Sequence, residues 1–207
     1  MPPKEWVPRR SGYNPANLDH IVIKPVQQNI AVRSMEGAFK TIANRSRPPI
    51  DVKGYRRLAT SKEYLTPPHS SYEELEELYW QQNLDDKGMP PIYGADVSSS
   101  LTDEDQKIWN IKHLDSMLAE LMEERIPGVN LPYLYFGMWK ATFSWHIEDM
   151  DLYSVNCKFS LTEIPLENIL LTDLHNGAPK TWYCIPPQFG YKLEQVTNFT
   201  FPTLCMI

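Results

Sequence analysis

Hydrophobic and polar residues follow a helical period in two stretches of this chain. In SSYEELEELYWQQ, Leu75, Leu78 and Tyr79 recur at helical intervals, and Ser71 and Glu74 have capping-box spacing. This pattern predicts a helix over 71–82. A second apolar stripe, which ends before Pro127 and Gly128, predicts a helix over 103–125; its members are Ile111, Leu114, Leu118 and Leu121.

Other stretches are rich in β-branched and aromatic residues and predict strands. Two short candidates are HIVIKPV (20–26) and GAFKTI (37–42). From Leu131 the run LPYLYFGMWKATFSWHIEDMDLYSV predicts successive strands with tight links. The expected fold class is therefore mixed α+β, with the two helices packed against a β-rich half.

Composition narrows the class of protein. The chain has 42% hydrophobic and 12% aromatic residues, enough for a packed core. Its net charge of -6 disfavours broad electrostatic binding to nucleic acid and suits a cationic partner such as a basic peptide. The three cysteines, Cys157, Cys184 and Cys205, form no disulfide framework and favour a reducing compartment. The amino end lacks the apolar core of a secretory signal, and no apolar run reaches the roughly 18 residues of a membrane span.

The triplet His146-Ile147-Glu148 is the first candidate for chemistry. On a strand, residues two apart face the same way, so His146 and Glu148 would project together. One imidazole and one carboxylate are two of the three ligands in a facial triad for Fe(II). The motif alone is common by chance, and a structural histidine is the alternative.

A second candidate lies in APKTWYCIPP, where Lys180 stands beside an aromatic stretch that predicts a strand. A lysine in such a pocket could pair with the carboxylate of a small dicarboxylate cosubstrate, with the amide of Asn156 nearby. A solvated surface lysine is the alternative.

The segments PPKEW, PIYGAD, GVNLPYLYFGMWKATFSWHIEDMDLYSVN and APKTWYCIPP resemble the jumonji-C (JmjC) histone lysine demethylases, specifically the lysine-specific demethylase 4 subfamily. The resemblance runs from Pro2 to about Gln195 with one interruption. It implies an Fe(II)- and 2-oxoglutarate-dependent dioxygenase on a double-stranded β-helix of the jelly-roll, cupin-like kind. Such an enzyme hydroxylates the N-methyl group of a methylated histone-three tail lysine and releases formaldehyde. The implied setting is chromatin in the nucleus, without sequence-specific nucleic-acid or membrane contact.

The resemblance also implies residue roles. The iron ligands are His146 and Glu148. The 2-oxoglutarate binders are Tyr93, Asn156 and Lys180, with Phe143 and Trp182 as aromatic walls. The substrate-binding residues are Gly128, Tyr135 and Glu148 around the methylammonium group, and Asp96, Val129, Tyr133 and Asp149 beside the peptide. Pro127 stands where the family often has a glutamate, which puts one peptide contact in doubt.

The chain also departs from the family pattern. Its five histidines are His20, His69, His113, His146 and His175. None stands where the family has its second iron-binding histidine, so the third iron ligand is expected to be absent. The family zinc site is mostly missing, with Cys205 at best a remnant. The expected organisation is the tail of a JmjN segment (1–12), a linker region of mixed structure with one helix (13–102) and a truncated JmjC domain (103–207).

The interruption is CKFSLTEIPLENILLTD, residues 157–173, where the family has one tyrosine. Cys-Lys and Thr-Asp at its ends can be encoded with splice donor and acceptor patterns, and excision would restore Asn-Tyr-Leu-His in frame. We expect a retained intron; a genuine surface loop is the alternative.

Three hypotheses follow for the chain itself. The first is a demethylase whose encoded product is incomplete and inactive alone. The second is a non-catalytic histone-tail-binding fragment. The third is a product that does not fold, because half a β-helix leaves unpaired strand edges and exposed apolar surface.

Overall fold

The computed structural model describes residues 18–32, 39–84, 88–101, 107, 110–113, 116–156 and 180–200. The chain forms two compact units, Met1–Ser144 and Trp145–Ile207. The expected JmjN tail (1–12), the insertion (157–173), His175 and Cys205 lie outside the described residues. No helix within the described ranges is both long and apolar enough to cross a bilayer.

The first unit is built on a four-stranded antiparallel sheet in the order β3-β2-β5-β6. Its strands are β2 (Val26–Val32), β3 (Phe39–Ser46), β5 (Ile92–Ser98) and β6 (Tyr133–Phe136). A two-stranded sheet pairs β1 (Val22–Ile23) with β4 (Ile50–Asp51). The antiparallel sheets and helices confirm the mixed class. The strand candidates at 20–26 and 37–42 are confirmed in part, because Lys24 and Pro25 separate β1 from β2 and β3 begins at Phe39.

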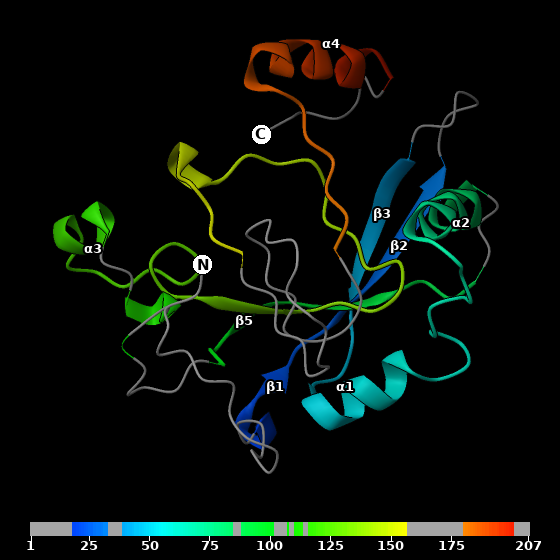
Figure 1. Cartoon of the computed structure of the whole chain (residues 1–207), viewed down its shortest axis with the longest axis horizontal. Helices are drawn as coiled ribbons and strands as arrows, with labels where there is room; N and C mark the ends of the chain where they lie inside the picture. The colour runs from blue at the N-terminus through cyan, green and yellow to red at the C-terminus, as the bar shows by residue number, and fades with distance from the viewer. Residues whose placement is uncertain are drawn as a thin grey trace. The chain divides into compact units, whose positions relative to one another are not determined.

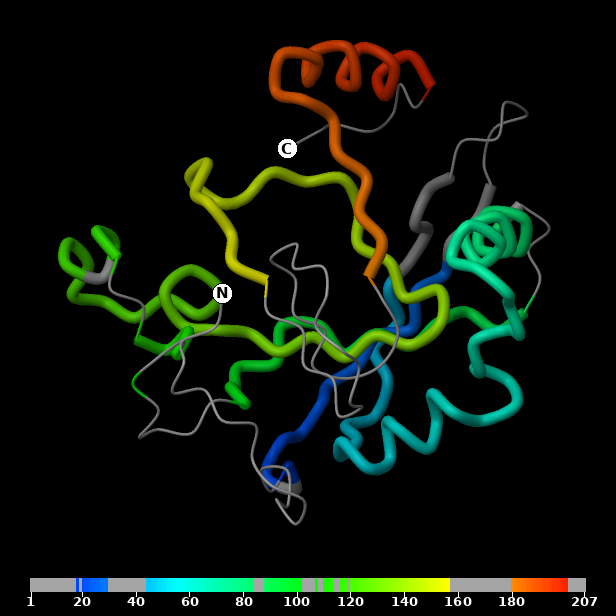
Figure 2. Tube along the Cα trace, in the orientation of Figure 1, coloured from blue at the N-terminus to red at the C-terminus, as the bar shows by residue number. Residues whose placement is uncertain are grey.

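Three helical segments of the described residues precede β5. A short 3-10 helix, η1 (Leu18–His20), precedes β1. The helix α1 (Val52–Ala59) is capped by Asp51, whose carboxylate accepts a hydrogen bond from the Gly54 N–H at 2.6 Å. No described helix or strand lies between it and α2 (Tyr72–Leu84), and Figure 2 shows the course of this link. The helix α2 lies beside β2 (Figure 1).

The capping residues of α2 confirm the helix predicted over 71–82. The Ser71 hydroxyl accepts a hydrogen bond from the Glu74 N–H at 3.2 Å. The Glu74 carboxylate in turn accepts from the Ser70 N–H at 2.7 Å and from the Ser70 hydroxyl at 2.6 Å. The reciprocal bond therefore reaches one residue further back than in the usual capping box.

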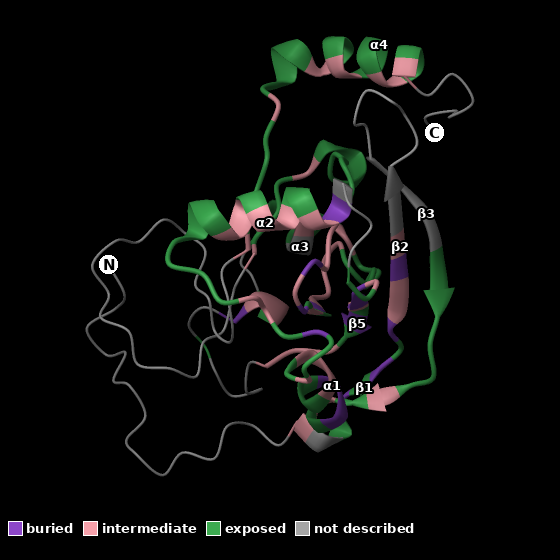
Figure 3. Ribbon diagram, turned by 90° about the vertical axis from the view of Figure 1, so that its right-hand side faces the viewer, coloured by how far each residue is buried: buried purple, intermediate pink, exposed green. Residues whose placement is uncertain are grey.

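The hydrophobic core lies in the first unit, and its buried residues come from β1, α1, β5, β6 and the segments next to them. Buried stretches are drawn in purple in Figure 3, for example beside α1 and β1. Tyr55 stands inside it and donates from its hydroxyl to the carbonyl oxygens of Ile92 and Phe136, each at 2.6 Å. Burial raises the pKa of the Tyr55 phenol. The remaining buried hydrophobic residues are Ile21, Ile23, Tyr64, Val97, Leu134 and Met138.

The continuous helix predicted over 103–125 was wrong. The structure has a 3-10 turn, η2 (Ile111–His113), and one short helix, α3 (Met117–Leu121), while residues 122–126 are not helical. Asn110 is buried, and its side-chain oxygen accepts a hydrogen bond from the Lys112 N–H at 3.0 Å. Such a local bond offers the backbone an alternative to helical pairing.

The second unit contains η3 (Asp149–Asp151), η4 (Pro187–Phe189) and α4 (Gly190–Thr200). Its described residues, 145–156 and 180–200, include no strand, so the strands predicted through His146 and through Lys180 were wrong. A strand needs a neighbouring strand for its N–H and C=O groups, and no strand pairing is assigned to the described residues 145–156 and 180–200. Met150 and Asp151 also have φ values of 56° and 53°, which end any extended run.

Candidate functional site

Three phenol rings gather where β5 meets β6. The ring centroids of Tyr93 and Tyr135 lie 6.3 Å apart, and Tyr133 stands at 90° to Tyr135, also at 6.3 Å. Tyr133 and Tyr135 are two residues apart on one strand, so both belong to the same face. We call Tyr93, Tyr133 and Tyr135 the tyrosine cluster.

Asp96 places a carboxylate beside the tyrosine cluster. The register of β5 against β6 shifts between Gly94 and Val97, and Asp96 lies in this irregularity with φ 56°. Aspartate tolerates this left-handed conformation better than most residues. The Tyr135 phenol hydrogen-bonds to Asp96. The bulge thus aims a negative charge at the phenols.

The phenols respond to burial and to this charge. Burial, with a smaller effect of the Asp96 charge, raises the pKa of Tyr93 to about 12. Burial first and then Asp96 raise the pKa of Tyr135 as well. Both phenols therefore stay protonated at neutral pH and can serve as hydrogen-bond donors.

Glycine is required at position 128, because the turn there lies against the ring of Tyr133. Its φ is +84°, and a Cβ there would lie 2.6 Å from the Tyr133 ring. The turn is fixed by a Gly128 N–H bond to the Leu131 carbonyl at 2.8 Å. Val129 follows in the same turn and is half-buried. Any other residue at 128 would strain the backbone and displace Tyr133.

The chemistry of this arrangement favours a cation that lacks N–H donors. Aromatic faces attract such a cation through their quadrupole, and a nearby carboxylate adds charge attraction. Tyr135 is 53% exposed, so the cluster is open to a ligand.

Phe143, predicted as an aromatic wall of the 2-oxoglutarate site, directly follows Thr142, whose backbone is held by the side chain of Gln28. Gln28 is buried, and its side-chain amide donates to the Thr142 carbonyl at 2.6 Å and accepts from the Thr142 N–H at 2.9 Å. The Thr142 hydroxyl also lies 2.8 Å from the Tyr79 hydroxyl on α2. Phe143 itself is half-buried. Neither Gln28 nor Tyr55 was found by sequence reasoning, because no motif marks a residue whose partner lies 114 or 81 positions away.

The predicted iron ligands lie in the second unit. His146 and Glu148 are exposed, and Glu148 directly precedes η3, which contains Asp149. Among the described residues, no three His, Cys, Asp or Glu side chains gather as a metal site. The described part of the chain therefore supplies two candidate donors and does not complete a three-residue iron site. The amide of Asn156 donates to the Ser154 hydroxyl at 3.3 Å.

Lys180 is half-buried rather than fully solvated. Its ammonium nitrogen lies 4.1 Å from the centroid of the Trp182 ring. Burial lowers the pKa of Lys180, and the negative charge of Glu148 opposes that change. Glu148 and Lys180 are therefore within electrostatic reach of each other, although 32 positions separate them.

Comparison with known proteins shows which sequences this chain is similar to. Residues 133–202 match the family described as JmjC domain, hydroxylase. The chain is 44% identical over 205 residues to the human "Probable lysine-specific demethylase 4F". It is 44% identical over 206 residues to "Lysine-specific demethylase 4D" of Rattus norvegicus and 45% identical over 206 residues to "Lysine-specific demethylase 4B" of Mus musculus. This chain is a homologue of the lysine-specific demethylase 4 proteins.

The resemblance stated from the motifs is thereby confirmed. Each alignment covers 98% of this chain. The chain spans 28%, 36% and 17% of the length of these three relatives, in the same order. The homology thus covers the tyrosine cluster in the first unit and the residues from His146 to Trp182 in the second.

Proposed function

We propose that this chain forms part of a histone lysine demethylase that oxidises the N-methyl group of a histone-three tail lysine and releases formaldehyde. The observation that carries this proposal is the 44–45% identity to three proteins named as lysine-specific demethylases, over 98% of the chain. The implied setting is chromatin in the nucleus.

The tyrosine cluster and Asp96 support a methylated lysine as ligand. A trimethylammonium group offers no hydrogen-bond donor, so aromatic faces and carboxylates are the groups that can hold it. In this proposal Tyr135, Gly128 and Glu148 line the methylammonium pocket. The peptide passes beside Asp96, Val129, Tyr133 and Asp149, whose two carboxylates suit the basic histone tail.

The proposed cofactors are Fe(II) and 2-oxoglutarate. His146 and Glu148 would be two iron donors, and since the described residues gather no third, we derive no step through the metal. Lys180 would pair with a carboxylate of 2-oxoglutarate, an anion that restores the charged form which burial disfavours. Tyr93 would donate from its phenol and Asn156 from its amide, with Phe143 and Trp182 as aromatic walls.

The wider architecture is part of the same proposal. It comprises a JmjN tail over 1–12, a linker region over 13–102, and a JmjC domain from 103 onward with a double-stranded β-helix interrupted by residues 157–173. Sequencing of the mature transcript tests the retained intron, which is rejected if this segment is present in every message.

Formaldehyde release from a trimethylated histone-three peptide tests the activity. The assay compares the 207-residue chain with a version that has a tyrosine in place of 157–173 and is extended through the strands that follow in a relative. We expect turnover in the extended version, and Lys180→Met in that version should raise the KM for 2-oxoglutarate. An extended version that binds 2-oxoglutarate and peptide but releases no formaldehyde would contradict the proposed activity.

A second candidate function is recognition of the histone tail without catalysis. It is favoured by the coexistence of a formed tyrosine cluster with only two candidate iron donors among the described residues. Calorimetry distinguishes the two, because recognition alone predicts methylated-peptide binding that a metal chelator does not change and that releases no formaldehyde.

A further inference from the structure

The charge of the chain is divided between two regions. Residues 18–62 contain nine Lys and Arg against three Asp and Glu, a net charge of +6. The rest of the chain contains 11 Lys and Arg against 23 Asp and Glu, a net charge of -12. The overall value of -6 therefore hides a strongly basic segment, and such asymmetry indicates an electrostatic contact.

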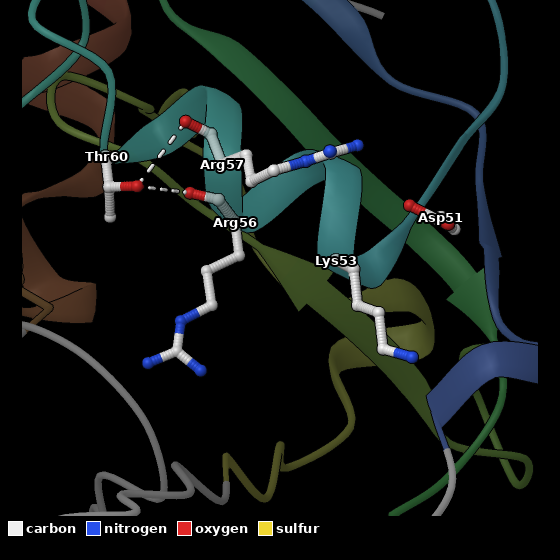
Figure 4. Close-up of a pocket in the computed structure, with 5 residues that line it drawn as sticks. All are labelled: Asp51, Lys53, Arg56, Arg57 and Thr60. Atoms are coloured by element: carbon white, nitrogen blue, oxygen red, sulfur yellow. Dashed lines mark hydrogen bonds between the residues drawn. The ribbon is translucent and has the colours of Figure 1, made fainter.

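Part of this charge is concentrated on α1. Lys53, Arg56 and Arg57 are exposed and lie at i, i+3 and i+4, so they share one face of the helix. Lys53 and Arg56 extend from the same side of α1, and an open pocket of about 510 Å³ is lined by these three residues with Asp51 and Thr60 (Figure 4). Asp51 is engaged in capping Gly54.

Further cations lie on the segments next to α1. β4 leads directly into α1 and pairs with β1, which is followed by Lys24. The N–H of Arg47 donates to the Pro25 carbonyl at 2.9 Å, which places Arg47 next to Lys24. Both side chains are exposed. We call Lys24, Arg47, Lys53, Arg56 and Arg57 the basic face.

Helix stabilisation does not account for all of these residues. Arg56 and Arg57 stand in the last turn of α1, where positive charge favours the helix dipole. That explanation leaves out Lys24, Arg47 and Lys53. Several cations on separate elements match a ligand with repeating negative charges better than one small anion.

We propose that the basic face binds the phosphate backbone of double-stranded DNA, without reading its sequence. The choice of DNA over an acidic protein rests on the proposed function, since histone tails leave a particle around which DNA is wrapped by backbone contacts. The net charge of -12 on the rest of the chain repels DNA, so the contact is confined to this face.

Fluorescence anisotropy with a labelled duplex tests this contact. The 207-residue chain is titrated against a duplex of about 30 base pairs between about 50 and 200 mM salt, where each phosphate contact adds roughly 0.9 to the slope of log K against log salt. The triple variant Lys53→Gln, Arg56→Gln, Arg57→Gln should weaken binding at least about tenfold and reduce the slope by about 2 to 3.

A second triple variant gives the same change in net charge elsewhere. Lys107, Arg125 and Lys192 are exposed, and their replacement by Gln should leave the affinity within about twofold. Equal losses in both triple variants, or no duplex binding by the unaltered chain, would overturn the proposal. So would a polyglutamate peptide that binds the basic face more tightly than the duplex does, which would identify an acidic protein as the partner.

Two further measurements separate this proposal from other causes of failure. Circular dichroism should show the same spectrum and thermal midpoint for both triple variants; should the first misfold, Arg56→Gln alone should still reduce the slope by about 0.9. Formaldehyde release from a free histone peptide needs no DNA. Its failure would reject the demethylase and leave the DNA measurement unaffected.

Discussion

The two units of this chain use apolar residues in opposite ways. In the first, Ile23 is 0% exposed, and strands around it pair with one another. In the second, Ile147 is 81% exposed and Phe199 is 82% exposed, and none of the described residues from 145 onward is buried. Both regions are rich in aromatic residues. The difference therefore comes from strand pairing, which gathers side chains on one face, and not from composition.

This difference also divides the candidate site. The tyrosine cluster and Asp96 stand on paired strands, which fix side-chain directions. His146, Glu148 and Lys180 stand on segments without a described ladder. The third hypothesis, that the chain does not fold, applies most to the second unit, because exposed apolar surface there promotes association.

The largest expected effect comes from replacing isoleucine by alanine once in each unit and comparing the loss of stability. Ile23→Ala removes a fully buried side chain and should lower the free energy of unfolding by about 2–5 kcal/mol. Ile147→Ala should change it by no more than about 0.5 kcal/mol. Urea denaturation followed by tryptophan fluorescence measures both, and similar losses for the two variants would show that Ile147 is buried in solution.

The side-chain amide of Gln28 is buried, so its removal tests the contribution of buried hydrogen bonds to the stability of the first unit. Gln28→Ala leaves the N–H and the C=O of Thr142 without their partner, which should cost about 2–3 kcal/mol of unfolding free energy. Gln27→Ala on the same strand is the matched control, since its one side-chain bond is a weak one of 3.4 Å to Asn29. Equal effects of the two substitutions would mean that the bonds from Gln28 to Thr142 add nothing.

Asp96→Asn sharpens the description of the tyrosine cluster. Asparagine also accepts a positive φ, so the bulge should persist while the charge is lost. The pKa of Tyr93, about 12 in the unaltered chain, should fall but stay above about 10 because burial remains its main cause. Ultraviolet titration follows the phenolate, and an unchanged pKa would mean that Asp96 does not face the phenols.

The same shift has a consequence for stability. The folded phenol of Tyr93 holds its proton more tightly than the unfolded one, whose pKa is about 10. Its contribution to stability is therefore complete below pH 10 and is lost as the pH rises through about 12. Asp96→Asn should make this alkaline loss smaller.

The smallest expected effect concerns the start of α2. Hydrogen bonds from the Ser70 side chain and backbone lower the pKa of Glu74 below its usual 4.5. A lowered folded pKa stabilises the helix above that usual value, and the contribution is lost as the pH falls through the folded pKa. Circular dichroism should show a loss of helix on acidification that is smaller in Glu74→Gln. Glu77→Gln, on the same helix, should behave like the unaltered chain.

Local signals in the sequence predicted what local interactions decide. The helix over 71–82 was found because Ser71 and Glu74 bond within one turn. The prediction of a helix over 103–125 was wrong because an apolar stripe does not reveal that Asn110 is buried and that its side chain accepts a hydrogen bond from the Lys112 N–H. The short α1 was missed because its stability comes from the buried Tyr55 and the Asp51 cap, which carry no long periodic pattern.

The candidate site shows the same limit. The motif around His146 indicated a resemblance to the lysine-specific demethylases, which the sequence comparisons confirm. The two-residue period of the same motif predicted a strand, but the structure assigns none there, because a strand also depends on pairing with a distant segment. The roles predicted for His146, Glu148, Asn156 and Lys180 stay predictions. The contacts of Gln28 and Tyr55 join distant parts of the chain and could not be read from either end alone.

Gly94 lies on β5, one residue after Tyr93 of the tyrosine cluster, and leaves no room for any other amino acid. A Cβ there would collide with a methyl group of Ile23 and would lie 3.2 Å from the Cβ of Phe136. Every amino-acid change from glycine adds that atom, so each missense mutation in this codon meets the same obstruction. We expect selection to remove such alleles whenever the product is needed, which makes this codon a genetic indicator of whether the protein is in use.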